Sequence, residues 1–225
     1  MLLGYVAILM AIRRQDSLAA WLILCAAFID AIDGRTAKLL EATSEIGAQL
    51  DAMSDVLTFC VAPAVLLYQQ FFSNWGPPGI AVSSLLIVSG TFRLARFQSQ
   101  HCGEREYFAG LPTPAATGLM AGFAAFSHEV GSDASFSLVA AVLVVCGSLL
   151  MVSSIPYESD LFIEPGRILK HWKGLVFILF VASLFPFRGG AFFGWACVYV
   201  AFGLIRSLVT HLKRWPKSLI PETSN

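Results

Sequence analysis

The amino-acid sequence predicts an all-α protein, a polytopic bundle of transmembrane helices. Three observations support this fold class. Of the 225 residues, 56% are hydrophobic and only 13% are charged, whereas a soluble domain carries about 25% charged residues. The mean hydropathy is +0.70. The apolar residues also come in long runs separated by short polar stretches, which is typical of helices that cross a membrane.

The apolar runs form about eight segments, and we expect six to eight of them to span the membrane. A spanning helix needs about 20 residues, or about 17 at the short end. The first segment, with 12 residues, and the seventh, with 14, fall below this length. The eight segments are residues 1–12, 18–33, 56–72, 79–95, 112–127, 136–153, 174–187 and 191–208.

The distribution of Lys and Arg predicts the orientation. If the chain starts in the cytoplasm and every segment spans, twelve of the 15 Lys and Arg residues fall on the cytoplasmic side. Only Arg13, Arg14 and Arg188 fall on the other side. The positive-inside rule therefore predicts a multi-pass protein of the cell membrane with both termini in the cytoplasm. The second segment then ends, and the third begins, at the cytoplasmic face.

The chain is expected to form one transmembrane domain, residues 1–212, followed by a polar tail, residues 213–225. The formal net charge is zero, so no basic field points to nucleic acid as a partner. Membrane lipids are the expected surroundings of a chain with this composition.

Four aspartates lie where the second segment ends and the third begins. Asp30 and Asp33 are three residues apart and Asp51 and Asp55 are four apart, so each pair shares one face of its helix. A carboxylate inside a membrane helix costs about 2.5–3.5 kcal/mol, so four of them together call for positive charge in between. Oxygen ligands select hard cations such as Mg²⁺, Mn²⁺ or Ca²⁺. We therefore predict a metal site here, large enough for two ions and suited to a diphosphate substrate.

Small and basic residues surround the four acids. Gly34, Ala37 and Gly47 recur at helical spacing, which allows a backbone or a flat nucleotide base to approach closely. Arg35 and Lys38 add positive charge that can pair with phosphate. An active site at the cytoplasmic face is the expected result.

The run from Asp30 to Asp55 resembles the signature of the CDP-alcohol phosphotransferases, D-x-x-D-G-x-x-A-R-x8-G-x-x-x-D-x-x-x-D. The spacing agrees at every position. The one departure is Lys38, which keeps the charge of the family's Arg but not its bidentate pairing with phosphate. Further stretches resemble the phosphatidylserine synthase branch: Arg93–Phe97 reads R-L-A-R-F, and Phe108–Ala116 reads F-A-G-L-P-T-P-A-A.

This resemblance implies transfer of a phosphatidyl group from CDP-diacylglycerol to an alcohol, with release of CMP and with two divalent cations, Mg²⁺ or Mn²⁺, as cofactors. It implies that Asp30, Asp33 and Asp51 hold the metals. Asp55 would lie nearby, contributing to the metal site and acting as general base on the acceptor hydroxyl. The resemblance also suggests a homodimer.

The resemblance implies substrate contacts as well. Gly34, Ala37 and Gly47 would line the cytidine pocket, and Lys38 would contact phosphate.

Serine is the acceptor that the resemblance favours. Its carboxylate needs a cationic partner, and Arg93 and Arg96 share a helical face at the cytoplasmic end of the fourth segment. The same chemistry with glycerol 3-phosphate, inositol phosphate or choline is the alternative. A cation transporter is a remote alternative, because intramembrane carboxylates also mark ion pathways.

Overall fold

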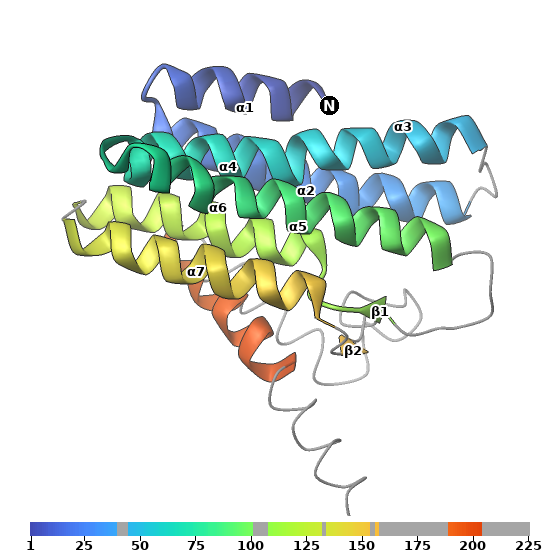
Figure 1. The fold of residues 1–225 in the computed structure, drawn as a ribbon. Coiled ribbons are helices and arrows are strands. Elements are labelled where there is room, and N and C mark those ends of the chain that lie inside the picture. The colour runs from blue at the N-terminus through green and yellow to red at the C-terminus, as the bar shows by residue number, and fades with distance from the viewer. Residues whose placement is uncertain (40–44, 101–107, 132–133, 154–155, 158–188, 204–225) are drawn as a thin grey trace, which may run out of the picture.

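The structure, a computed structural model, describes residues 1–39, 45–100, 108–131, 134–153, 156–157 and 189–203 (Figure 1). Apart from one pair of two-residue strands, the regular elements in these ranges are helices, which confirms the predicted all-α class. The main helices are α1 (Leu2–Ile12), α2 (Asp16–Leu39), α3 (Glu45–Asp55), α4 (Ala62–Leu67), α5 (Pro77–Gln100), α6 (Thr113–Val130), α7 (Ala134–Val152) and a C-terminal helix (Gly189–Gly203). Strand β1 (Phe108–Ala109) pairs antiparallel with β2 (Pro156–Tyr157).

Two helical stretches are long and apolar enough to cross a membrane. They are Gln49–Trp75, with 27 residues, and Pro77–Phe97, with 21 residues. Shorter apolar helices lie at Leu2–Ile12, Phe136–Val152 and Gly189–Gly203. The predicted segment 174–187 lies outside the described residues. The number of spans and their orientation stay predictions.

The first long stretch is an irregular rod that begins with α3. It continues through a π-helical turn, η1 (Val56–Val61), then α4, a second π-helical turn, η2 (Tyr68–Phe72), and a short 3₁₀ turn, η3 (Ser73–Trp75). Pro63 gives a local reason for irregularity, because it has no N–H to donate to the carbonyl of Phe59 four residues earlier. The hydroxyl of Thr117 in α6 donates to that carbonyl instead, at 2.8 Å. The rod is thereby fastened to α6.

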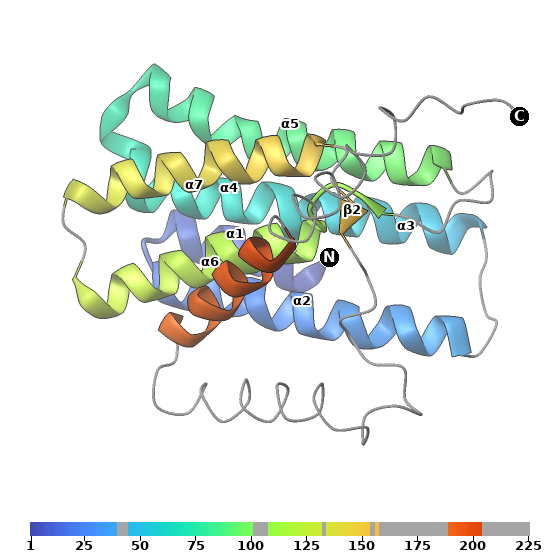
Figure 2. The ribbon, with the colours of Figure 1, turned by 90° about the horizontal axis from the view of Figure 1, so that it is seen from below.

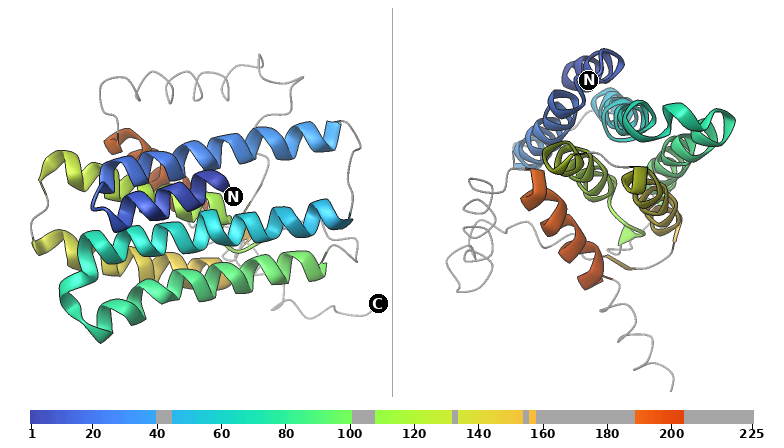
Figure 3. Two further views of the ribbon diagram at one scale, coloured as in Figure 1. Left: turned by 90° about the horizontal axis from the view of Figure 1, so that it is seen from above. Right: turned by 90° about the vertical axis from the view of Figure 1, so that its left-hand side faces the viewer.

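The helices pack around a common apolar core (Figure 3). Helix α1 packs along α2, α2 packs against α6, and α5 packs against α7. Among the fully buried side chains are Ile23, Leu66, Met120 and Val144. Many large apolar side chains face outward, among them Leu149, which is 67% exposed. An outward apolar surface of this kind is typical of a protein that faces lipid.

The C-terminal helix lies across α6 (Figure 2). Its Phe193 ring contacts the rings of Phe123 and Phe126, with centroids 5.2 and 5.8 Å away. Gly122 permits this crossing, because a Cβ at that position would lie only 2.9 Å from the backbone nitrogen of Phe193. The crossing brings residues of the C-terminal helix close to the start of α6.

The two ends of the bundle are built differently (Figures 1 and 3). At one end, α2 finishes, α3 begins, α5 finishes and α6 begins. At the other end the chain turns tightly at Arg14, Gly76 and Gly131, which have φ values of 61°, 62° and 94°. The side chain of Arg14 joins the turn between α1 and α2 to η2 and η3, because it donates to the carbonyl of Gln69 and to Ser73 Oγ. The motif from Asp30 to Asp55 covers the second half of α2 and α3, which meet at the first end.

Candidate active site

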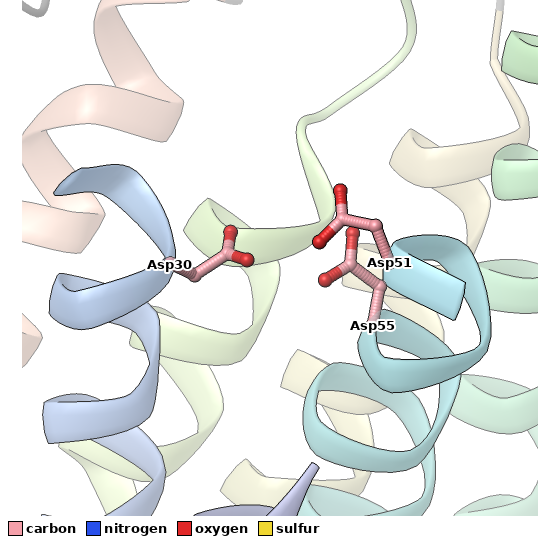
Figure 4. A group of neighbouring side chains, drawn as sticks. All are labelled: Asp30, Asp51 and Asp55. Atoms are coloured by element: carbon pink, nitrogen blue, oxygen red, sulfur yellow. The ribbon is translucent and has the colours of Figure 1, made fainter. Parts of the chain in front are cut away.

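Three carboxylates meet between α2 and α3 (Figure 4). Asp30 comes from α2, while Asp51 and Asp55 come from successive turns of α3. One carboxylate oxygen from each lies within 4.8 Å of the others. Asp51 is exposed, whereas Asp30 and Asp55 are half-buried. The site is therefore open to solvent on one side and enclosed by the bundle on the other.

The fourth aspartate of the motif lies outside this group. Asp33 is one turn beyond Asp30 on α2, and its side chain is exposed. Residues three apart on a helix differ by about 60° in direction, so Asp30 can face α3 while Asp33 points more toward solvent. The role of Asp33 as a metal ligand stays a prediction.

The small and basic residues of the motif follow the acids along the same helices. The backbones of Gly34, Ala37 and Lys38 form the last turns of α2, and the side chains of Ala37 and Lys38 are not among those that the structure describes. Gly47 is in the first turn of α3 and is exposed. These positions are compatible with the predicted nucleotide pocket, which stays a prediction.

Close helix contacts below the acids position the site. Gly90 lets α5 approach η1, because a Cβ there would clash with the thiol of Cys60 and would lie 3.3 Å from the Met151 methyl carbon. Gly4 does the same for α1, since a Cβ there would lie 2.9 Å from the Cα of Thr58. Two helices thus press against the turn that directly follows Asp55.

Arg93 of α5 lies within the bundle beside this site. Its side chain is only 8% exposed. Its Nη1 donates to the hydroxyl of Thr113 at 2.6 Å, while its buried Nε has no hydrogen-bond partner among the described residues. The charge of the guanidinium acts on Asp55. It also interacts electrostatically with Tyr199 of the C-terminal helix.

Arg96, one turn further along α5, is placed differently. It is half-exposed, and its Nη1 makes a long hydrogen bond of 3.5 Å to the carbonyl of Val152 at the end of α7. The sequence paired Arg93 and Arg96 as equal candidates for binding the acceptor. The structure brings Arg93 toward the acids and directs Arg96 toward the end of α7.

The loop before α6 is anchored on the end of α7. Gly110 has a φ of 91°, and a Cβ there would lie 2.5 Å from the carbonyl oxygen of Met151. The next residue, Leu111, donates its N–H to the carbonyl of Leu150 at 3.0 Å. Only glycine tolerates both the left-handed φ and this close contact. The anchored loop fixes the point at which α6 begins, and with it the position of Thr113.

The acidic group fits a hard divalent cation. Its donors are carboxylate oxygens, the ligand type that Mg²⁺ and Mn²⁺ prefer. Opposite oxygens around Mg²⁺ are about 4.2 Å apart, given bonds of about 2.1 Å, which is close to the 4.8 Å spread seen here. Three neighbouring carboxylates repel one another, and the single charge of Arg93 does not neutralise them. Asp30, Asp51 and Asp55 could therefore hold a cation.

Sequence reasoning gave no role to Thr113 or Thr117. Both are 1% exposed, and one accepts from Arg93 while the other donates to the carbonyl of Phe59. The signal was present in the sequence, since the two threonines lie four apart and so share one face of a helix. Their partners, however, come from segments 20 and 58 residues away, which no local pattern reveals.

Comparison with known proteins identifies the class. The sequence model of the CDP-alcohol phosphatidyltransferase family matches residues 1–154, well over half of the chain. The chain belongs to this family, and is therefore a membrane transferase of phospholipid biosynthesis. Members of the family act on a CDP-linked lipid and an alcohol acceptor, and generally depend on a divalent metal.

Individual relatives show which branch of the family this chain resembles. The chain is 32% identical over 222 residues to the CDP-diacylglycerol–serine O-phosphatidyltransferase of Helicobacter pylori, a match that covers 94% of this chain and 88% of the relative. It is 37% identical over 162 residues to the enzyme of that name from Mycobacterium bovis, covering 69% and 56%. It is also 34% identical over 159 residues to the archaetidylserine synthase of Methanothermobacter thermautotrophicus, covering 68% and 64%. The resemblance to the phosphatidylserine synthase branch is confirmed.

Proposed function

We propose that this chain transfers the phosphatidyl group of CDP-diacylglycerol to the hydroxyl of L-serine, giving phosphatidylserine and CMP. The observation that carries the proposal is the meeting of Asp30, Asp51 and Asp55 beside the buried Arg93. The names of the relatives, which refer to serine, support the choice of acceptor. Glycerol 3-phosphate, inositol phosphate and choline are the other acceptors that the assay must test.

The acidic residues divide the work of the reaction. Asp30, Asp33 and Asp51 would hold the cations, Mg²⁺ or Mn²⁺, with Asp55 completing the ligand set. When bound, the ions supply positive charge that neutralises the diphosphate and the charge that develops during transfer. Gly34, Ala37 and Gly47 would allow the cytidine to lie close to the backbone, and Lys38 would pair with a phosphate.

Asp55 would act as the general base. The serine oxygen forms a bond to the phosphorus of the phosphatidyl group, and the bond from that phosphorus to the oxygen bridging to CMP breaks. CMP leaves with that oxygen, and the serine hydroxyl proton passes to the Asp55 carboxylate. A hydroxyl is a weak nucleophile near neutral pH, so a positioned carboxylate is needed. The half-buried position of Asp55, deeper than Asp51, suits this role.

Arg93 would bind the serine carboxylate. A buried guanidinium with an unpartnered Nε retains donors for a further ligand. A single such cation suits an acceptor with one carboxylate, whereas an acceptor bearing its own phosphate would favour more cationic side chains. Arg96, half-exposed and directed toward Val152, would act at the edge of this pocket.

We also propose that residues 1–212 form the transmembrane domain and 213–225 a polar tail, with both termini and the active site on the cytoplasmic side. The count of Lys and Arg supports this orientation. A homodimer, which the resemblance suggests, is part of the same proposal.

Purified membranes that contain the chain test the reaction directly. They are incubated with CDP-diacylglycerol and Mn²⁺ or Mg²⁺, together with labelled serine, glycerol 3-phosphate, inositol phosphate or choline in separate reactions. We expect label from serine to enter lipid, with an equal amount of CMP released. Label from another alcohol would move the chain to a sibling activity, and no CMP with any alcohol would overturn the proposal.

Two variants make the result specific. Asp55→Asn is expected to abolish CMP release, because the amide cannot accept the hydroxyl proton. Asp16→Asn is the matched control: Asp16 is also an aspartate, but it lies at the opposite end of α2 from the acids. The control is expected to keep wild-type activity.

A further inference from the structure

We propose that Thr113 is the positioning residue for acceptor recognition, because its hydroxyl holds the Arg93 guanidinium in the orientation that receives the acceptor's carboxylate. The inference rests on the proposed function and adds a residue to it. It concerns a contact between two buried side chains from α5 and α6, which neither the motif nor the resemblance assigns.

The guanidinium of Arg93 makes only some of the hydrogen bonds that its N–H groups can donate to the described residues. A guanidinium carries five N–H donors in a rigid plane. Here the Nη1 group donates to Thr113 Oγ1 at 2.6 Å, and the buried Nε has no partner among the described residues. A buried charged group with an unpartnered donor is costly unless a ligand completes its bonding. We infer that an anionic group of the substrate completes the bonding of this guanidinium, whose charge also acts on Asp55.

Thr113 is itself held rigidly. It is 1% exposed and is the first residue of α6. On its N-terminal side, Leu111 is bonded to the end of α7. One turn further along α6, Thr117 is bonded to the carbonyl of Phe59, just after Asp55. The start of α6 is thus fixed to both α7 and η1, so the Thr113 hydroxyl has a defined place from which to orient Arg93.

Hydrogen bonding at one end of a guanidinium fixes the plane of the whole group, since the group is planar and rigid. Without Thr113, the Arg93 side chain would keep its charge but could turn toward Asp55 and away from the acceptor. The expected consequence is weaker binding of an acceptor that has a carboxylate, with little change in the binding of CDP-diacylglycerol.

The experiment compares Thr113→Val, which keeps the shape and removes the hydroxyl, with Thr113→Ser, which keeps the hydroxyl. Serine and ethanolamine, which is serine without its carboxylate, are offered as acceptors to the full-length enzyme in its membrane. We expect Thr113→Val to raise KM for serine about tenfold, equivalent to about 1.4 kcal/mol, with KM for CDP-diacylglycerol unchanged. The preference for serine over ethanolamine should fall by a similar factor, and Thr113→Ser should restore both.

Ser127→Ala is the control for a merely structural effect. Ser127 is a fully buried hydroxyl on the same helix, bonded to the carbonyl of Ala124 and to the side chain of Gln70, far from the acids. It is expected to lower stability without changing KM for serine. If the valine variant does not fold, Thr113→Ala removes the same hydroxyl without adding bulk and takes its place.

The outcomes separate the inference from the proposed function. The wild-type enzyme decides the function, since no turnover of serine would overturn that proposal whatever the variants do. Given serine turnover in the wild type, an unchanged KM for serine in the hydroxyl-free variants would overturn the inference. So would a loss of kcat alone, or an equal rise in KM for both substrates, because each would indicate a general effect on folding.

Discussion

At the scale of single residues, burial and direction decide what each charged group can do. Asp30 and Asp33 share a helix face, yet only Asp30 joins the group with Asp51 and Asp55. Arg93 and Arg96 are also three residues apart on one helix, yet of these two only Arg93 is buried, with its charge acting on Asp55. The three grouped carboxylates should therefore matter most for binding the first cation.

Single Asp→Asn changes at the acids should differ in their effect on metal dependence. Asp51→Asn removes a grouped ligand and is expected to lower activity at least 100-fold at low Mn²⁺, roughly the upper effect of losing a metal-orienting group. Asp33→Asn should have the smaller effect, because Asp33 lies outside the group. The measurement is CMP release against Mn²⁺ concentration. An equal shift of the Mn²⁺ midpoint in both variants would contradict the inference that Asp51 belongs to the metal-binding group and Asp33 lies outside it.

Asp16 offers a test of pH-dependent stability away from the active site. Burial raises the pKa of its carboxyl from 3.8, although Arg14 and His128 act in the opposite direction. One carboxylate oxygen is buried without a hydrogen-bond partner among the described residues. Between the unfolded and folded pKa values the folded state then binds more protons than the unfolded state, so this group's contribution to stability falls as pH rises through that window.

Asp16→Asn should remove that dependence. We expect the variant to be slightly more stable than the wild type near neutral pH, with the difference shrinking as the pH falls to about 4, near the ordinary Asp pKa. Thermal unfolding of both proteins in detergent at several pH values checks this. A wild type that becomes the more stable of the two as pH rises would show that Arg14 and His128 outweigh burial.

At the scale of elements, the irregular rod depends on a contact between helices. Pro63 has no N–H, so it cannot donate the usual helix hydrogen bond to the carbonyl of Phe59. The hydroxyl of Thr117 in α6 donates to this carbonyl instead. Thr117→Val should leave that buried carbonyl unsatisfied and cost about 1–3 kcal/mol in the free energy of unfolding. Thr117→Ser keeps the donor and should cost less.

A double-mutant cycle isolates this contact. Pro63→Ala supplies a backbone N–H four residues after Phe59, so Thr117→Val should cost clearly less in the Pro63→Ala background than in the wild type. Thermal or denaturant unfolding of the four proteins gives the coupling. The same cost in both backgrounds would mean that the Thr117 hydroxyl does not replace the missing helix bond.

The elements also show what the sequence could and could not predict. Apolar runs predicted the helices, and the motif predicted which two helices carry the acids, because both depend on spacing along one segment. The predicted end of the second segment at residue 33 was too early, since α2 continues to Leu39. The pairing of Arg93 with Thr113 depends on how α5 and α6 cross, and the anchoring of Gly110 depends on carbonyls at the end of α7. Contacts between distant segments leave no periodic signal in a single sequence, so these features emerged only from the fold.

At the scale of the whole molecule, the two ends of the bundle differ in chemistry. The acids lie at the end where α2 finishes and α3 begins, while Arg14 and the Gly131 turn lie at the other (Figure 1). Arg14 is bonded to the carbonyl of Gln69 and to Ser73. The positive charge of Arg14 is thus partly engaged by the protein, which is compatible with the proposal that this end faces away from the cytoplasm.

Cysteine labelling of intact cells tests the orientation. In a background without the five native cysteines, Val130→Cys, at a side chain that is 61% exposed, reports on the far end. Ile46→Cys, at a side chain that is 72% exposed, reports on the acid end. A membrane-impermeant thiol reagent should label Val130→Cys in intact cells and Ile46→Cys only after the membrane is opened. The reverse pattern would invert the orientation and place the acids outside, away from a cytoplasmic supply of substrates. Labelling of both in intact cells would mean that the two ends do not lie on opposite sides of the membrane, and the bundle would then not span it in the way its apolar surface indicates.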